Sequence, residues 1–227
     1  MKQIGVVALV AFAMLPLGCA SGVHLDTDPM ATGQKIDRIG DLSMAIDRSP
    51  RDPELYAKRA LAYENNGEYK TAIADLDQAI LIKPDNPQYR FLRGIAYAYA
   101  GDDSMAQQEF ERAMAMDPGS YQSYNARAWL MATAPDAQLR NGKKAVEYAT
   151  KACEMTNWQD PDVVGTLAAA YAETGDFDNA IKWQQKSIDL TSTTLLVTLD
   201  ERKARLALYQ NHQPWRPTQP NHPLTPS

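Results

Sequence analysis

Two cysteines and three histidines are the side chains of this sequence that could most readily carry catalysis or bind a metal. Cys153 follows a small residue within a helical pattern, so we expect a buried, inert thiol there. His24, His212 and His222 lie near the two ends of the chain, where none is placed to act as a general base. No pair of metal-ligand residues has zinc-site spacing, and no glycine-rich phosphate loop is present. The sequence therefore predicts no enzyme, no metal and no cofactor.

Cys19 is the cysteine whose surroundings indicate chemistry. Lys2 precedes an apolar run over residues 4–17, and a glycine stands directly before Cys19. A short positive region, an apolar stretch and a small residue before the cut are typical of a secretory signal peptide. The end of this segment resembles a lipobox, in which the cysteine is diacylated and becomes the first residue of the mature protein. Pro16 departs from that motif, which usually has Leu, Val or Ile there.

The lipobox resemblance implies a bacterial lipoprotein whose signal peptide is residues 1–19. A covalent lipid on Cys19 would be its only link to a membrane, and residues 20–34 would form a flexible linker. Ala20, in place of Asp, implies sorting to the outer membrane, on its periplasmic face. The alternative is an ordinary signal peptide with an incidental cysteine. If Cys19 is acylated, one thiol remains and no intramolecular disulfide can form.

The overall composition is that of a folded protein. Hydrophobic residues make up 44% and charged residues 22% of the 227, which is too apolar for a disordered chain. The net charge of −5 argues against nucleic acid, which is usually met by a basic surface. No later segment approaches the roughly 20 consecutive apolar residues of a transmembrane helix.

Three arginines, Arg59, Arg93 and Arg127, recur at a spacing of 34 residues. A row of arginines could bind an anion. We interpret them instead as members of ion pairs that form between the two helices of a repeating unit and recur from one unit to the next. Their expected acidic partners lie on the second helix of each unit: Asp75, Asp77, Glu109 and Glu111.

Small residues recur at three positions of four successive units, mostly with the same 34-residue spacing. Two helices that cross closely need Ala or Gly at the contact so that their backbones can approach. Glycines at the end of the first helix fit the left-handed conformation that stops it. The small positions are Ala60, Gly94, Ala128 and Ala168; Ala72, Ala106, Ala145 and Ala180; and Ala79, Ala113, Ala152 and Ser187. The turn glycines are Gly67, Gly101 and Gly175.

This pattern resembles the tetratricopeptide-repeat (TPR) family over about residues 53–190. The resemblance implies an all-α fold, an α-α superhelix with an N-terminal half-repeat and a C-terminal capping helix. The expected parts are a domain at 35–209, with repeats at about 53–86, 87–120, 121–160 and 161–193 and a cap at 194–209, and a proline-rich tail at 210–227. The third repeat is five residues longer than its neighbours, and its stretch 132–142 is either a recognition loop or a longer connection.

The TPR resemblance also implies a concave groove lined by the first helix of each repeat, where family members usually bind peptides or helices. Large apolar residues at these positions predict an apolar peptide or amphipathic helix as ligand. The groove-facing positions hold no Lys or Arg, so a carboxylate clamp is disfavoured. Alternatively, the chain's own terminal segments cover two of the residues, Phe91 and Trp129. The predicted groove residues are Leu61, Phe91, Ile95, Tyr99 and Trp129.

The tail carries a proline at every third position, which would align five prolines on one face of a polyproline II helix. It could be a ligand, a spacer, an autoinhibitory strand or a disordered end. These prolines are Pro214, Pro217, Pro220, Pro223 and Pro226.

The sequence thus predicts a membrane-tethered scaffold or adaptor that binds proteins in the bacterial cell envelope. The alternatives are a soluble periplasmic module for secretion or chaperoning, and an accessory subunit of an envelope enzyme.

Overall fold

The structure is a computed structural model that describes residues 34–191 and 196–217. The predicted lipidation site Cys19 and the signal peptide lie outside these residues. So do the linker up to residue 33 and the tail from residue 218 onward.

The described residues form ten α helices and one short 3-10 helix, with no strand among them. This confirms the predicted all-α solenoid, including the N-terminal half-repeat α1 and the capping helix α10. The α helices are α1 (Gln34–Arg48), α2 (Pro53–Asn65), α3 (Tyr69–Ile82), α4 (Pro87–Tyr99), α5 (Asp103–Met116), α6 (Tyr121–Thr133), α7 (Gly142–Met155), α8 (Pro161–Glu173), α9 (Phe177–Leu190) and α10 (Leu196–Gln210).

The helix starts follow from local sequence. Helices α2 and α8 each begin at a proline that follows an aspartate. The Asp52 side chain accepts a hydrogen bond from the amide of Glu54, and Asp160 accepts from the amides of Asp162 and Val163. These bonds satisfy amides that have no partner within the helix, and proline fits the first helical position because its missing N–H is not needed there.

Three glycines end the first helices of three repeats in a left-handed conformation. Gly67, Gly101 and Gly175 have φ angles of +78°, +82° and +81°. A side chain at such a φ is strained, so glycine allows the chain to turn back at once into the second helix. The predicted role of these glycines is confirmed.

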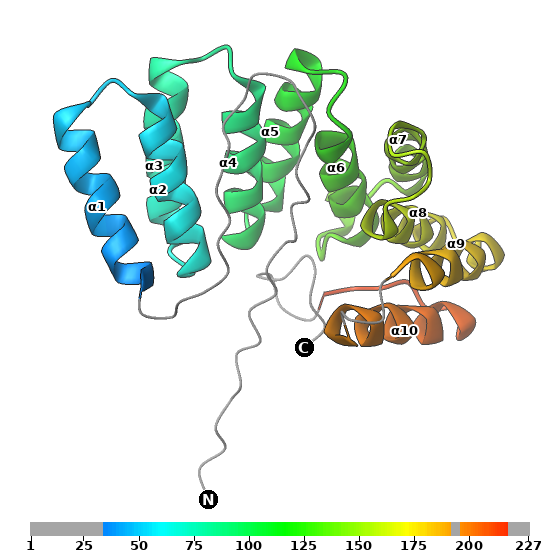
Figure 1. Cartoon of the computed structure of the whole chain (residues 1–227). Coiled ribbons are helices and arrows are strands. Elements are labelled where there is room, and N and C mark those ends of the chain that lie inside the picture. The colour runs from blue at the N-terminus through cyan, green and yellow to red at the C-terminus, as the bar shows by residue number, and fades with distance from the viewer. Residues whose placement is uncertain (1–33, 192–195, 218–227) are drawn as a thin grey trace, which may run out of the picture. The chain divides into compact units, whose positions relative to one another are not determined.

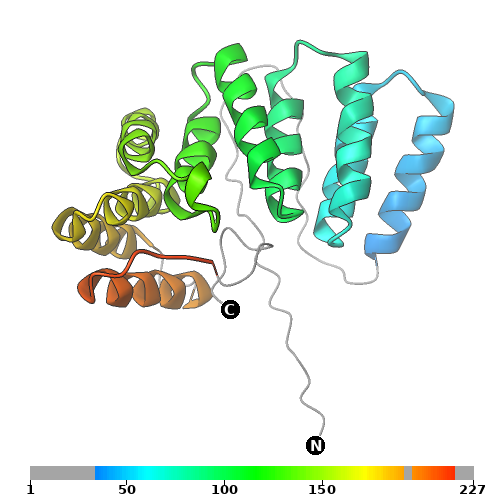
Figure 2. The ribbon, with the colours of Figure 1, turned by 180° about the vertical axis from the view of Figure 1, so that it is seen from behind.

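Each repeat is a pair of packed helices, and the pairs follow one another in chain order (Figures 1 and 2). We call them repeat 1 (α2 and α3), repeat 2 (α4 and α5), repeat 3 (α6 and α7) and repeat 4 (α8 and α9). In Figure 1 the axes of α8 to α10 are turned relative to those of α1 to α5. None of the described helices is both long enough and apolar enough to cross a membrane.

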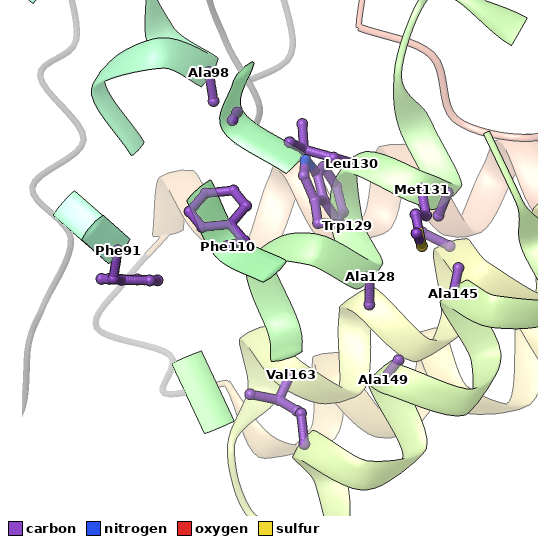
Figure 3. Packing of buried hydrophobic residues seen from close by; sticks show 14 of the residues in the cluster. Phe91, Ala98, Phe110, Ala128, Trp129, Leu130, Met131, Ala145, Ala149 and Val163 are labelled. Carbon is purple, nitrogen blue, oxygen red and sulfur yellow. The ribbon is translucent and has the colours of Figure 1, made fainter. Parts of the chain in front are cut away.

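The helix crossing of repeat 2 is tight enough to require glycine. A Cβ atom added at Gly94 would come within 2.6 Å of the Phe110 ring, so only glycine fits there. Phe110 also lies beside Phe91, with ring centroids 5.7 Å apart (Figure 3). In repeat 1 the equivalent positions hold Ala60 and Leu76. A larger residue thus stands in place of the glycine, and a smaller one in place of the phenylalanine. The repeats thus keep the crossing filled with different pairs of residues.

The longer turn of repeat 3 is held to the neighbouring repeats by hydrogen bonds. It contains the 3-10 helix η1 (Ala137–Leu139). Arg140 donates hydrogen bonds to the carbonyls of Ala134 and Pro135 and to the carboxylate of Glu173 in α8. Gln107 of α5 donates to the Leu139 carbonyl. These bonds anchor the turn to both neighbouring repeats.

Candidate protein-binding surface

The predicted groove residues come from the first helices of repeats 1 to 3, and we call them the first-helix surface. By the repeat register, Leu61, Ile95 and Trp129 occupy the same position in α2, α4 and α6. Leu61, Ile95 and Tyr99 are half-buried, whereas Phe91 and Trp129 keep only 8% and 6% of their surface exposed. The structure therefore divides the predicted strip into an accessible part in repeats 1 and 2 and an enclosed part.

Trp129 is covered from the C-terminal end of the chain. The guanidinium of Arg205 in α10 lies over its ring, 5.6 Å from the centroid. The segment after α10 returns towards α6, where Arg216 donates a hydrogen bond to the Ala132 carbonyl. Trp215, which is 9% exposed, belongs to the same buried cluster as Trp129. The sequence left open whether Trp129 faces an open groove or is covered by the chain's own segments. The structure shows it covered by the capping segment.

The first helix of repeat 4 is occupied in the same way. Arg202 of α10 bonds the carboxylate of Asp162 at 2.6 Å, and a Cβ atom at Gly165 would meet Arg202 Nη1 at 3.3 Å. Glu173, at the end of α8, accepts from Arg140 and Arg216. The small and acidic residues of this helix thus accommodate the arginines of α10 and the segment that follows it.

Glu64 of α2 distinguishes repeat 1 from the other three repeats, which have no acidic residue at this position. The equivalent positions of the other repeats hold the buried alanines Ala98, Ala132 and Ala172. The Oε1 atom of Glu64 is enclosed without a hydrogen-bond partner among the described residues, and burial raises the pKa of this carboxyl to about 8. Burial, with a contribution from Glu64, also raises the pKa of Tyr99 to about 12.

The arginine row forms the ion pairs expected, with one correction. Arg59 pairs with Asp75 inside repeat 1 at 2.7 Å. Arg93 pairs with Glu109 at 2.7 Å in its own repeat and with Asp77 of the preceding repeat at 2.6 Å. The row therefore links neighbouring repeats as well as paired helices.

Arg127 shows that the expectation of pairs within each unit was wrong for repeat 3. Among the described residues, its one ion pair is with Glu111 of the preceding repeat, at 3.0 Å. The position equivalent to Glu109 holds Tyr148, once the register is shifted by the five extra residues, and the Arg127 guanidinium lies 5.6 Å from the centroid of that ring. An open groove of about 690 Å³, lined by these side chains among others, lies between α5 and α7.

The remaining chemical candidates are structural. Cys153 is fully buried, and burial raises the pKa of its thiol to about 12, which confirms the expected inert thiol. His212 packs its ring 5.2 Å from that of Phe177. His24 and His222 lie outside the described residues. Within the described part of the chain, no group of three or more His, Cys, Asp or Glu side chains is arranged to hold a metal.

Sequence reasoning missed the buried arginines of α10. Within the capping helix predicted over residues 194–209, Arg202 and Arg205 are only 4% and 6% exposed. The signal was present in α8, where Gly165 and Ala169 stand at first-helix positions that hold large residues in repeats 2 and 3. Small residues there leave room for another part of the chain.

Paired helices with small residues at each crossing define an α-helical solenoid. Residues 65–101 match a family described as TPR repeat, and residues 42–74 and 162–194 match families described as tetratricopeptide repeat. The chain is a TPR-repeat protein, and such repeats form a protein–protein interaction module. No curated protein matches the chain at a significant level.

Several solved structures share the fold. A tetratricopeptide repeat protein from Parabacteroides merdae ATCC 43184 is 19% identical, with a TM-score of 0.62 over 78% of this chain and 67% of that one. MamA from Desulfovibrio magneticus RS-1 is 20% identical, with a TM-score of 0.54 over 70% and 90%. YrrB, described as a TPR protein with an unusual peptide-binding site, is 14% identical, with a TM-score of 0.57 over 72% and 81%.

Proposed function

We propose that this protein is a membrane-tethered scaffold of the bacterial cell envelope that binds an apolar peptide or amphipathic helix on the first-helix surface of repeats 1 and 2. The observation that carries the proposal is the partial exposure of Leu61 and Ile95 at equivalent positions of α2 and α4. Apolar side chains spaced along successive helices offer the anchoring contacts that such a ligand needs.

Two further observations support this location. The equivalent surface of repeats 3 and 4 is taken up by Arg202, Arg205 and Arg216, so the chain itself leaves repeats 1 and 2 for a partner. The likeness to YrrB, whose description names a peptide-binding site, is consistent with peptide binding by a solenoid of this size.

Tethering rests on the lipobox resemblance at Cys19. Metabolic labelling with an alkyne-tagged palmitate tests it directly, with Cys19→Ala as the control. Incorporation in the wild type and none in the variant supports the lipoprotein. Equal labelling, or no labelling, favours the soluble periplasmic module.

The binding surface is tested by capture of partners from an envelope extract with the full chain. The variant Leu61→Ala with Ile95→Ala removes the proposed contacts, and Leu81→Ala, on the second-helix side and 74% exposed, is the matched control. We expect the double variant to lose a protein that the wild type and Leu81→Ala both retain. Equal retention by all three would move the binding site elsewhere. Co-purification of an enzyme in fixed ratio would favour the accessory-subunit alternative.

A further inference from the structure

Arg205 is a buried cation that has no ion-pair partner among the described residues. It is 6% exposed, its Nε atom is enclosed, and within the described residues it makes neither an ion pair nor a hydrogen bond. Its contact is with the face of the Trp129 ring. Burial lowers the pKa of the guanidinium, because removing a charge from water is costly.

The other arginines of this region differ from Arg205. Arg202 bonds Asp162, Ser187 Oγ and the Pro161 carbonyl. Arg216 bonds Glu173 and two carbonyls. Glu201, one turn before Arg205 on α10, attracts it but forms no ion pair with it within the described part of the chain. The carboxylates of α8 are thus already used, and Arg205 retains its capacity to bind an anion.

Three more buried hydrogen-bond donors, on α6, on α10 and on the segment after α10, lack a partner among the described residues. They are the indole N–H groups of Trp129 and Trp215 and the hydroxyl of Tyr209, which is fully buried. Tyr209 lies one turn after Arg205 on the same face of α10. Buried donors are normally satisfied, because leaving one unpaired is destabilising. A group with several acceptor atoms and a negative charge would satisfy this set.

We propose that Arg205, Tyr209, Trp129 and Trp215 form a subsite for a carboxylate group of the bound protein partner, at the α10 end of the first-helix surface. The inference rests on the proposed function and deepens it, since it gives the partner an acidic residue or chain end next to its apolar part. The part of Arg205 that remains exposed is the point of contact. A carboxylate suits a guanidinium because its two oxygens accept parallel hydrogen bonds.

Acetate is the probe for this subsite, and it requires no knowledge of the partner. In the full chain with ¹⁵N-labelled tryptophan, the four indole N–H signals report separately. We expect those of Trp129 and Trp215 to shift saturably with acetate, and not with acetamide or chloride at equal ionic strength. Trp158 and Trp183, stacked on each other 4.9 Å apart, serve as internal controls. No shift at Trp129 and Trp215, or an equal shift with acetamide, would overturn the proposal.

Two substitutions on α10 assign the effect. Arg205→Met should weaken acetate binding about tenfold or more, because a hydrogen-bonded charge is lost. Lys203→Met removes the same charge from an exposed position of the same helix and should leave binding unchanged. Arg205→Met should also keep or raise the melting temperature, since an apolar side chain replaces an uncompensated buried charge. Equal binding by both variants contradicts the assignment.

The outcomes separate this subsite from the proposed function. If acetate shifts the two indole signals but partner capture does not depend on Leu61 and Ile95, the subsite is retained and the proposed binding surface is rejected. Capture that depends on Leu61 and Ile95 but persists in Arg205→Met, without acetate shifts, would reject the subsite alone.

Discussion

Repeats 1 and 2 differ from repeats 3 and 4 in what their first helices contact. In the first pair, Leu61 and Ile95 remain partly exposed, and arginines link the helices through ion pairs. In the second pair, α6 and α8 pack directly on each other, and Arg202 and Arg205 of α10 lie on their surfaces. The same repeat pattern thus yields one surface free for a partner and one used by the chain itself.

This difference shows that a repeat register alone does not define a binding surface. Leu61, Ile95 and Trp129 are equivalent in the register, yet only Trp129 is enclosed. Repeat proteins need their open ends covered, and here the cap also covers first-helix positions of repeats 3 and 4.

The largest expected effect concerns the ion pairs that hold repeats 1 and 2. Glu109 is fully buried and accepts hydrogen bonds from Arg93 and Arg112. Glu109→Ala should lower the free energy of unfolding by about 3 kcal/mol, because it removes a buried carboxylate and leaves the partly buried Arg93 guanidinium with Asp77 as its remaining ion-pair partner among the described residues. Urea unfolding measures the loss. Glu147→Ala is the control, since this exposed carboxylate of α7 forms no ion pair among the described residues and its loss should cost about 1 kcal/mol or less. Equal losses of unfolding free energy in both variants would contradict a larger contribution of Glu109 to stability.

The pH dependence of stability tests the accessible end. The folded pKa of Glu64, about 8, lies above the ordinary value of 4.5, so the folded state keeps a proton that the unfolded chain releases. Stability should therefore fall as the pH rises through the window between these two values, by on the order of 2 kcal/mol, which discounts the roughly 5 kcal/mol of the full shift because the side chain is only half-buried. Glu64→Gln should lack this fall in urea unfolding at a series of pH values. Parallel pH profiles for both proteins would show that Glu64 is not the cause.

The crossing in repeat 2 should tolerate no added methyl group. Gly94→Ala pushes a Cβ atom into Phe110 and should cost about 1–2 kcal/mol, after allowance for the better helix propensity of alanine. Adding Phe110→Leu recreates the Ala60 and Leu76 pair of repeat 1 and should recover part of the loss in thermal unfolding. If Phe110→Leu adds its full cost to that of Gly94→Ala, the two residues do not compensate each other.

The smallest effect concerns the cover of Trp129. Glu173→Gln weakens the bonds to Arg140 and Arg216 and should cost about 1 kcal/mol. Amide hydrogen exchange should become faster in residues 211–217 while α2 to α5 stay unchanged. Faster exchange in repeats 1 and 2 as well would mean that the two halves are not independent.

Much of the fold could be predicted because it is local. The spacing of small residues gives the repeats, and Asp52, Asp160 and the turn glycines act within a few residues of their own position. The partner of Arg127 could also have been found by shifting the register for the five extra residues of repeat 3, which brings Tyr148 into place.

The cover of the candidate surface could not be predicted in the same way. An amphipathic pattern over residues 194–209 predicts a helix with one apolar face, but not which surface that face covers. Arg202 and Arg205 look like solvated charges until their contacts with Asp162 and Trp129 are known. Those contacts join residues that are 40 and 76 positions apart, and no local rule reaches that far.

The position of α10 has a consequence for synthesis. A chain is synthesised N-terminus first, and an exported chain also crosses the membrane N-terminus first, so α6 and α8 are available to fold before the helix that covers them. Until residues 196–217 arrive, the uncovered surface of α8 consists of Asp162, Gly165, Ala169 and Glu173, which offers little to aggregation. During that delay Trp129 presents a large apolar ring that becomes covered only when α10 is in place.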